Sequence, residues 1–184
     1  MPTPQPATPL HYRIEPADLH AHLFHVTLTI AQPAAQQRVA LPVWIPGSYM
    51  VREFAKNLQN LRATQGRRSV LVQQLDKATW QVDATPGKPL VLSYAVYALD
   101  NSVRTAWLDA SRGFFNGTSL CLQVAGQETL PHTLELVSTR ATAAWHVATG
   151  LPTVATDTRG FGSYVADDYD ALVDHPFELG HFWS

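Results

Sequence analysis

The sequence is short of the residues that build many enzyme sites. Of its 184 residues one is a cysteine, Cys121, and two are methionines. A single cysteine excludes a disulfide framework or a cysteine metal cluster within the chain, and it suits a reducing compartment. We expect Cys121 to be a small buried thiol in the core.

Charge of one sign and long apolar runs are also missing. With 13 basic and 15 acidic residues, the chain has no strong field to attract phosphates, so nucleic acid is not an expected partner. No stretch approaches the ~18 apolar residues of a membrane span, so no membrane contact is expected. The proline-rich start MPTPQPATPL lacks the regions of a signal peptide. These features predict a disordered leader over residues 1–9 and a soluble, cytoplasmic protein.

The common catalytic motifs are absent. The sequence contains no His-Glu-x-x-His zinc motif, no Gly-x-Ser-x-Gly elbow and no Gly-x-x-x-x-Gly-Lys phosphate loop. His20 and His22 could share one face of a strand and hold an ion, but a catalytic zinc needs a third protein ligand. The other interpretation is an exposed strand face, and His25 is expected to be exposed as well. The chain itself is therefore predicted to hold no zinc and to hydrolyse no peptide.

Alternation of apolar and polar residues is the dominant pattern that is present. Such period-two runs predict half-buried strands, here within residues 24–30, 39–45, 90–98, 120–124 and 134–136. Glycine and proline turns separate the runs, at residues 65–68, 85–89, 125–128 and 149–152.

Only one stretch has a helical signal. Residues 166–176 could form one or two helical turns, with Asp167 or Asp168 as the N-terminal cap and Pro176 as the end. The predicted fold class is therefore all-β: a β-sandwich of mostly antiparallel strands with at most one or two short helical turns. Residues 10–184 are expected to form it as a single domain.

Two loops are rich in aromatic and polar side chains. In PVWIPGSYMVREF, residues 42–54, the Pro46-Gly47 pair suits a type II turn that projects Ser48, Tyr49 and Met50. The stretch DASRGFFNGTSL, residues 109–120, carries Arg112 and two phenylalanines. Loops on a rigid sheet often carry function, but aromatic residues beside turns also seal the end of a sandwich.

Four stretches together resemble a known family. In their order and spacing, WIPGSYMVREFAKNL, DKATW, RGFFNGTSL and DDYDALVDHPFELG are similar to the N-terminal domain of the glycyl aminopeptidase family of zinc metallopeptidases. The resemblance covers nearly all of residues 10–180. It implies a β-rich, non-catalytic domain followed in the full protein by a thermolysin-like catalytic domain with the zinc site, and then by a PDZ domain. The chain ends at GHFWS before any zinc motif, so the expected partners are its own catalytic domain and the peptide substrate.

The resemblance also suggests a role for the first loop. The full enzyme would release small N-terminal residues such as glycine, and this domain would wall one side of the substrate cleft. Glu53 is the suitable charge for a substrate ammonium group, and Trp44 and Phe54 would anchor the loop to the sandwich. The cleft candidates implied in this way are Ser48, Tyr49, Arg52, Glu53 and Asn116. Phe182, Trp183 and the Pro46–Met50 loop are expected to form an exposed apolar patch.

A free-standing β-sandwich module for binding or interaction is the alternative function. A glycan-binding module would need a row of exposed aromatic rings on one face, whereas the five tryptophans lie in separate segments. An interaction scaffold would work through an edge strand. A His-Glu-x-x-His segment encoded downstream would support the peptidase, and a stop codon would support the module.

Overall fold

Strands make up most of the structure. The computed structural model describes residues 9–45 and 49–182, so the predicted leader lies almost wholly outside the described residues. The strands are β1 (Leu10–Asp18), β2 (Leu23–Ile30), β3 (Gln36–Ala40), β4 (Leu58–Gln65), β5 (Arg68–Val70), β6 (Val72–Gln74), β7 (Thr79–Asp83), β8 (Leu90–Tyr97), β9 (Ala106–Leu108), β10 (Arg112–Phe115), β11 (Gln123–Val124), β12 (His132–Leu136), β13 (His146–Thr149), β14 (Thr153–Thr156), β15 (Gly162–Ala166) and β16 (Phe177–Gly180). The helical elements are the 3-10 turns η1 (Phe54–Asn57) and η2 (Arg140–Thr142) and the short helices α1 (Gly117–Leu120) and α2 (Tyr169–Asp174).

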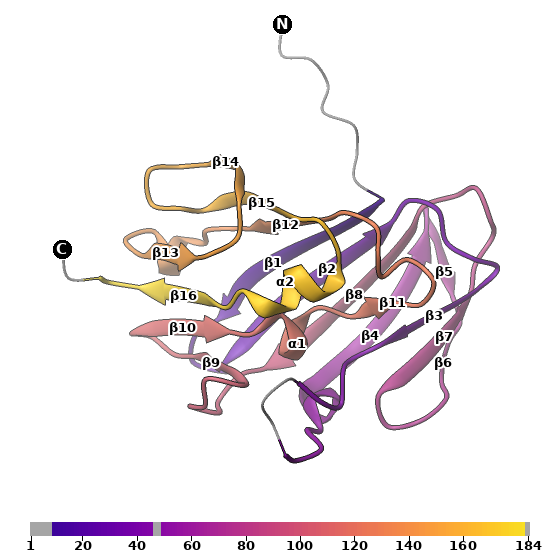
Figure 1. Ribbon diagram of the computed structural model, residues 1–184, viewed down its shortest axis with the longest axis horizontal. Helices are drawn as coiled ribbons and strands as arrows, with labels where there is room; N and C mark the ends of the chain where they lie inside the picture. The colour runs from indigo at the N-terminus through magenta and orange to yellow at the C-terminus, as the bar shows by residue number, and fades with distance from the viewer. Residues whose placement is uncertain (1–8, 46–48, 183–184) are drawn as a thin grey trace, which may run out of the picture.

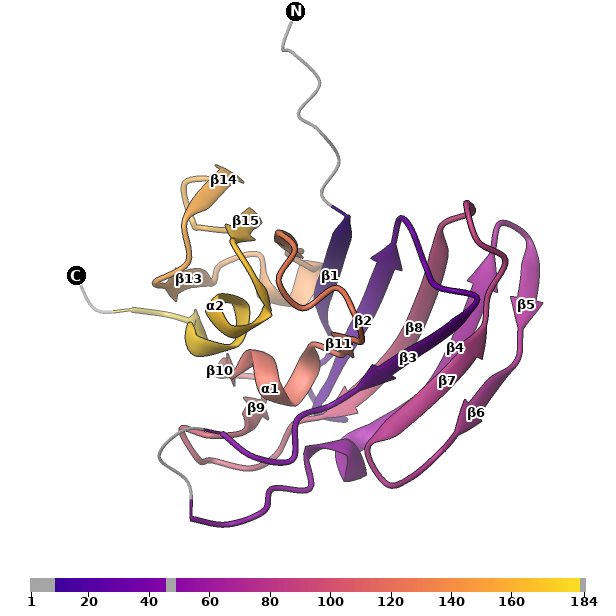
Figure 2. The same ribbon diagram turned by 45° about the vertical axis from the view of Figure 1, so that its right-hand side comes forward.

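The strands form three sheets in two layers. The large sheet has the order β14-β15-β12-β1-β2-β8-β4-β5, and the two smaller sheets have the orders β13-β16-β10-β9 and β11-β3-β7-β6. Figures 1 and 2 show both smaller sheets and the two α-helices on one face of the large sheet. Among the described pairs, β1 and β12 run parallel and the others are antiparallel. The predicted all-β sandwich of mostly antiparallel strands is confirmed.

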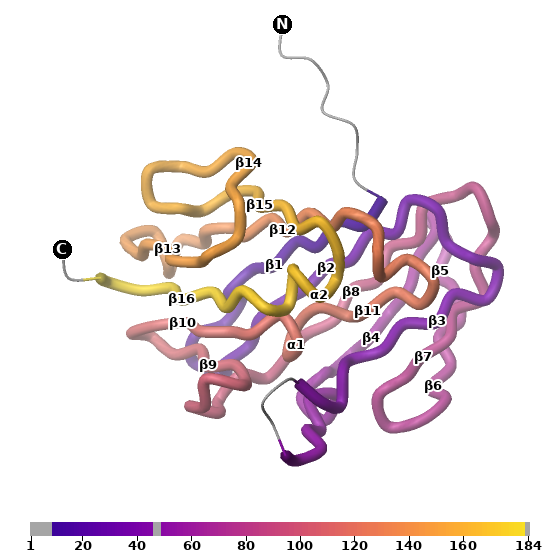
Figure 3. Tube along the Cα trace, viewed as in Figure 1, coloured from indigo at the N-terminus to yellow at the C-terminus, as the bar shows by residue number. Residues whose placement is uncertain are grey.

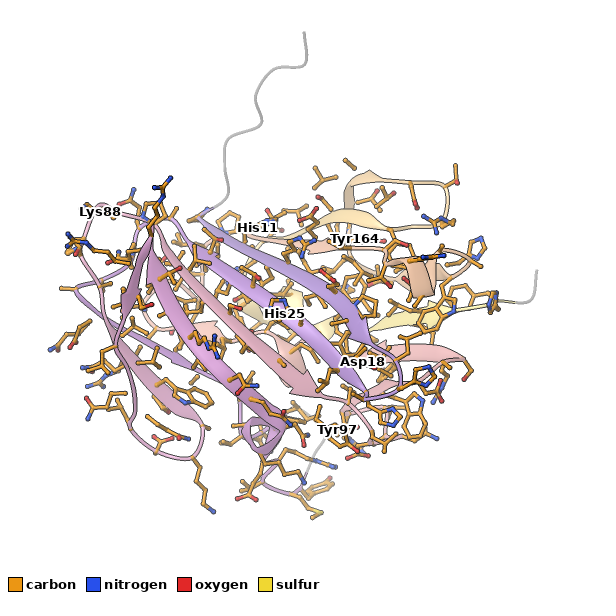
Figure 4. All side chains as sticks on the ribbon, turned by 180° about the vertical axis from the view of Figure 1, so that it is seen from behind. His11, Asp18, His25, Lys88, Tyr97 and Tyr164 are labelled. Carbon is orange, nitrogen blue, oxygen red and sulfur yellow. The ribbon has the colours of Figure 1, made fainter. Side chains whose placement is uncertain are left out.

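The core lies between the layers and follows the alternation in the sequence. In β1, Leu10, Tyr12 and Ile14 are fully buried, while the residues between them are half-buried. The outer face of the large sheet, seen from behind in Figure 4, carries His11 and His25. His25 is half-buried there, with Nε2 3.1 Å from the Ser93 hydroxyl, so it is less exposed than predicted.

Two predicted strands are shorter than expected. β3 ends at Ala40, whereas the alternation continued to residue 45. Pro42 explains the end, because proline cannot donate a ladder hydrogen bond, and Val43 beyond it is 47% exposed. Within the predicted strand 120–124, Leu120 belongs to α1, and β11 contains only two residues.

The predicted placement of His20 and His22 on a strand is wrong, because both residues lie in the turn between β1 and β2. The Asp18 carboxylate accepts hydrogen bonds of 2.9 Å from the backbone N–H groups of His20 and Ala21, as turn-forming aspartates commonly do. His22 has a φ of 59°, and its Nδ1 lies 2.6 Å from the Leu108 carbonyl. Among the described residues, no group of three possible metal ligands gathers.

The predicted helical turn is confirmed as α2. Asp168 is its N-terminal cap, because its side chain accepts a hydrogen bond of 2.7 Å from the Ala171 N–H. The helix ends before His175, which adopts the extended conformation that a following proline favours. Neither α2 nor any other helix in the described part of the chain is long and apolar enough to cross a membrane.

Candidate functional site

A groove of about 830 Å³ opens on the face that carries the two α-helices. Segments that are distant in sequence contribute to its lining, and Figure 3 shows α1 and α2 side by side at this face. Its lining comes from the segment Pro42–Ile45, from Val103 and Arg104, from Asn116 and Thr118 beside α1, from Gln123, and from α2 with its cap. A concave surface shared by several elements is the usual setting for a binding site.

Three buried tyrosines hold the chain segment that leads from α1 to β11. The hydroxyls of Tyr94, Tyr169 and Tyr12 donate hydrogen bonds of 2.6, 2.8 and 2.7 Å to the consecutive carbonyls of residues 120, 121 and 122. Burial raises the pKa of each phenol well above 10.0, so each remains a neutral donor. These bonds satisfy carbonyls that a continuous strand would have paired, and they explain why the predicted strand 120–124 is broken.

The wall formed by α2 packs closely against α1. A side chain at Gly117 would place its Cβ 2.9 Å from the Val173 Cα, closer than real Cβ atoms come. Glycine at this position therefore allows the two helices to touch. Asp170 and Asp174 remain on the exposed side of α2 and line the groove.

Asn116, a predicted cleft residue, lines this groove. It is half-buried, and its side-chain amide donates a hydrogen bond to the Val103 carbonyl. Its backbone N–H donates a bond of 3.1 Å to the Thr105 carbonyl. Asn116 therefore connects α1 to the loop that carries Val103 and Arg104, and it shapes the groove on that side.

The cleft candidates Tyr49, Arg52 and Glu53 lie in the segment next to the groove. The Arg52 N–H donates a hydrogen bond of 2.7 Å to the Val43 carbonyl, which brings residues 49–53 alongside the groove-lining segment 42–45. The Tyr49 side chain is fully exposed. Ser48 and the Pro46-Gly47 turn lie outside the described residues.

Glu53 has a partner that sequence reasoning did not find. Its carboxylate accepts a hydrogen bond of 3.0 Å from Lys77 Nζ. That bond, together with the positive charge of Lys77, lowers the pKa of Glu53 below 4.5. Both side chains are exposed, so the pair is weakened by solvent and salt.

The expected anchors of the loop behave differently from each other. Phe54 is 4% exposed and belongs to the core, as predicted. Trp44 is 56% exposed and lines the groove, so its ring does not anchor the loop in the core as Phe54 does. The alternation that would place Val43 and Ile45 on the core face places Trp44 on the opposite face, which agrees with its exposure.

Exposed apolar side chains concentrate beside the groove. We call this set the apolar rim: Val43, Trp44, Tyr49, Met50, Val51 and Val103, each at least 47% exposed. Phe182 is 44% exposed and follows β16, whose end lies away from segment 49–53 in both Figure 1 and Figure 2. The expected patch is therefore divided, and its Trp183 lies outside the described residues.

The loop over residues 109–120 seals the core more than it lines the groove. Phe115 is fully buried, and Phe114 is half-buried. Arg112 Nη1 lies 3.5 Å from the Glu178 carboxylate, and its guanidinium lies 5.9 Å from the centre of the Trp107 ring. Of the other tryptophans, Trp80 and Trp145 are buried, so the described ones make no exposed row for a glycan.

The chemistry of the described residues favours binding. Cys121 is fully buried, as predicted, and burial raises the pKa of its thiol, which makes it a poor nucleophile. The groove itself combines carboxylates, one guanidinium, amides and apolar side chains. Such a set can recognise a charged, partly apolar partner.

His132 is a buried histidine that sequence reasoning did not single out. It is fully buried, its Nδ1 lies 2.6 Å from the Leu130 carbonyl, and its ring packs between those of Tyr12 and Tyr169. Its Nε2 has no hydrogen-bond partner among the described residues. Burial lowers the pKa of His132 below 6.5, because a charged imidazole would be desolvated there.

This shift predicts a loss of stability in mild acid. Because the folded-state pKa is depressed, the unfolded chain binds the proton more readily, and the free energy of unfolding falls as pH drops below about 6.5. Urea unfolding between about pH 7.5 and pH 5 should show this fall, and the His132→Phe variant, which keeps an aromatic ring, should show a shallower one. Equal pH dependence in both proteins would assign the effect to other groups.

Comparison with known proteins places these features in a family context. The model of the family "Peptidase M61 N-terminal domain" matches residues 11–181. An aminopeptidase N family protein from Idiomarina loihiensis is 46% identical with a TM-score of 0.90, over 93% of this chain and 29% of that chain. A two-domain M1 zinc metallopeptidase bound to L-tryptophan is 16% identical with a TM-score of 0.51, over 93% of this chain and 42% of that chain.

The two structures differ in how close they are to this chain in sequence, at 46% and 16% identity. At 16% identity the M1 zinc metallopeptidase shows the fold alone. The chain spans less than one third of the aminopeptidase N family protein and less than half of the M1 zinc metallopeptidase. A search of curated proteins found no match.

Proposed function

Because the chain belongs to the peptidase M61 N-terminal domain family, we propose that residues 10–184 form the single, non-catalytic N-terminal domain of a larger zinc metallo-aminopeptidase. The apolar rim is the observation that carries this proposal. Large apolar side chains gathered on one face of a small domain mark a surface that contacts another part of a protein. A domain that adjoins a catalytic domain would cover such a surface.

In the larger protein this domain would wall one side of the substrate cleft. Tyr49 is fully exposed, and Arg52 lies beside the groove-lining segment, so both can face a peptide across the domain boundary. Arg52 offers a fixed fork of donors that suits a peptide carboxylate or a neighbouring acid. Ser48, Glu53 and Asn116 are further cleft residues in this proposal, and the substrate would be a peptide with a small N-terminal residue such as glycine.

Zinc would belong to the adjoining domain. The described residues of this chain gather no set of three possible metal ligands, so they do not fit a zinc site. We also place the protein in the cytoplasm, because its one cysteine is a buried, unpaired thiol.

Kinetics of the larger peptidase test this role. Tyr49→Phe and Arg52→Ala should each lower kcat/KM on a glycyl substrate by about tenfold or more, which corresponds to about 1.4 kcal/mol of transition-state stabilisation. Matched controls are Tyr97→Phe and Arg67→Ala, which change exposed residues outside the groove and should leave kcat/KM unchanged. Unchanged kinetics in the Tyr49 and Arg52 variants, with unchanged zinc content and Tm, would contradict this role and would mean that segment 49–53 is structural only.

A further inference from the structure

The groove and the apolar rim form one continuous surface. Trp44 and Val103 belong to the rim and also line the groove. The hydrogen bond from Arg52 to Val43 holds segment 49–53 next to it. An occupant of the groove would therefore also cover apolar side chains of the rim, which gains free energy by removing them from water.

The charge of the groove selects the kind of occupant. Three aspartates, Asp168, Asp170 and Asp174, and one arginine, Arg104, are the charged residues of its lining. Asp168 accepts the capping hydrogen bond of α2. Asp170 and Asp174 make no ion pair or side-chain hydrogen bond within the described part of the chain, so their charges are available to a partner.

The spacing of these two carboxylates favours a cation between them. Asp170 and Asp174 stand four residues apart on α2, and like charges at this spacing repel each other. A lysine or arginine side chain placed between them would relieve the repulsion. Since the cap at Asp168 and the hydrogen bond from Tyr169 to the Cys121 carbonyl fix α2, the wall is prepared before a partner binds.

We propose that the groove, with Val43, Trp44 and Val103 of the apolar rim, is the docking surface for a basic, partly apolar polypeptide segment of the adjoining domain, an inference that rests on the proposed function and leaves Tyr49 and Arg52 to the substrate. The volume of about 830 Å³ is large enough for several side chains. The similar aminopeptidase N family protein is more than three times as long as the part that this chain matches. Within one protein, a tethered segment reaches millimolar effective concentrations, so modest affinity is enough to keep it docked.

Peptide binding to the 184-residue chain tests the proposal. The probe is a short capped peptide of alternating leucine and arginine, and its binding is followed by tryptophan fluorescence and by NMR shifts of the α2 amides. We expect a Kd below about 1 mM, and weaker binding as salt rises, because about 1 M salt screens charges beyond about 3 Å. A peptide with glutamate in place of arginine should bind at least about tenfold more weakly.

Variants of the chain locate the site. The double variant Asp170→Asn and Asp174→Asn should weaken binding by about tenfold or more while folding normally, because it removes a repulsive pair. Trp44→Ala should weaken binding through the rim. The control double variant Asp83→Asn and Glu135→Gln removes the same charge outside the groove and should bind like the parent chain.

Several results would overturn the proposal. The first is equal affinity for the two peptides, and the second is equal affinity of the Asp170/Asp174 double variant and the parent chain. The third is a dimer of the chain in sedimentation that the Trp44→Ala variant does not form. This assay needs no hydrolysis, so its failure leaves the kinetic test of Tyr49 and Arg52 intact. Normal peptide binding with unchanged kinetics in those variants would contradict the proposed function alone.

Discussion

The Phe115→Ala variant is expected to lose about 3–5 kcal/mol of unfolding free energy. Phe115 is fully buried, with its ring 4.9 Å from that of Phe177 and 5.4 Å from that of Phe24. It therefore joins the small sheet, through β10 and β16, to β2 of the large sheet. Truncation would leave a cavity between the layers and would remove both ring contacts.

Urea unfolding followed by tryptophan fluorescence measures this loss. Phe114→Ala is the matched control, because Phe114 is the adjacent residue on the other face of β10 and is only half-buried. It should cost much less. A cost for Phe115→Ala below about 1.5 kcal/mol would mean that the layers collapse around the gap and that this contact is not central to the fold.

Gly162→Ala is expected to cost about 3 kcal/mol or more. Gly162 has a φ of +139°, and a Cβ there would lie 2.2 Å from the Ala155 carbonyl oxygen and 2.8 Å from the Thr156 Cα. Both contacts are with the backbone of β14, which pairs with β15 at this position. Relief of the clash requires β14 to move away, so the pairing at the edge of the large sheet would be lost.

The Gly126→Ala variant separates the cost of backbone strain from the cost of a steric clash. Gly126 has a φ of +82° but has no atom within 4 Å of the added Cβ, so its variant carries only the conformational cost of about 1–2 kcal/mol. Hydrogen exchange of the β15 amides should accelerate in Gly162→Ala and remain unchanged in Gly126→Ala. Equal losses of stability in the two variants would show that β14 yields without cost.

The sequence was a good guide where the determining interactions are local. Alternation of apolar residues correctly located β2 and β8, because a slip of one residue would turn every side chain to the wrong face. The cap of α2 at Asp168 was also foreseeable, since the bond joins residues three apart. Exposure of Trp44 was foreseeable, because the alternation that places Val43 and Ile45 on one face places Trp44 on the other.

The candidate site could be predicted only in part. Asn116 and segment 49–53 were identified through the family resemblance, and the structure places Asn116 in the groove and the segment beside it. The acidic wall on α2 was not recognised as part of the site, because nothing in the local sequence indicates that Asp170 and Arg104 line one groove. The ion pair of Glu53 with Lys77 joins residues 24 apart, and no periodic pattern reports such a contact.

The sequence by itself determined the fold class, the strands with clear alternation, the capped helical turn and the family. Each of these depends on residues close together in the chain or on a motif that can be read directly. Only the tertiary structure decided where the sandwich opens into a groove. The hydrogen bond from Tyr12 to the Leu122 carbonyl spans 110 residues, and together with those from Tyr94 and Tyr169 it holds the turn from α1 to β11, where the sequence predicted a strand. The sequence does not reveal such contacts, because only the packing of the layers determines which buried carbonyls need a donor.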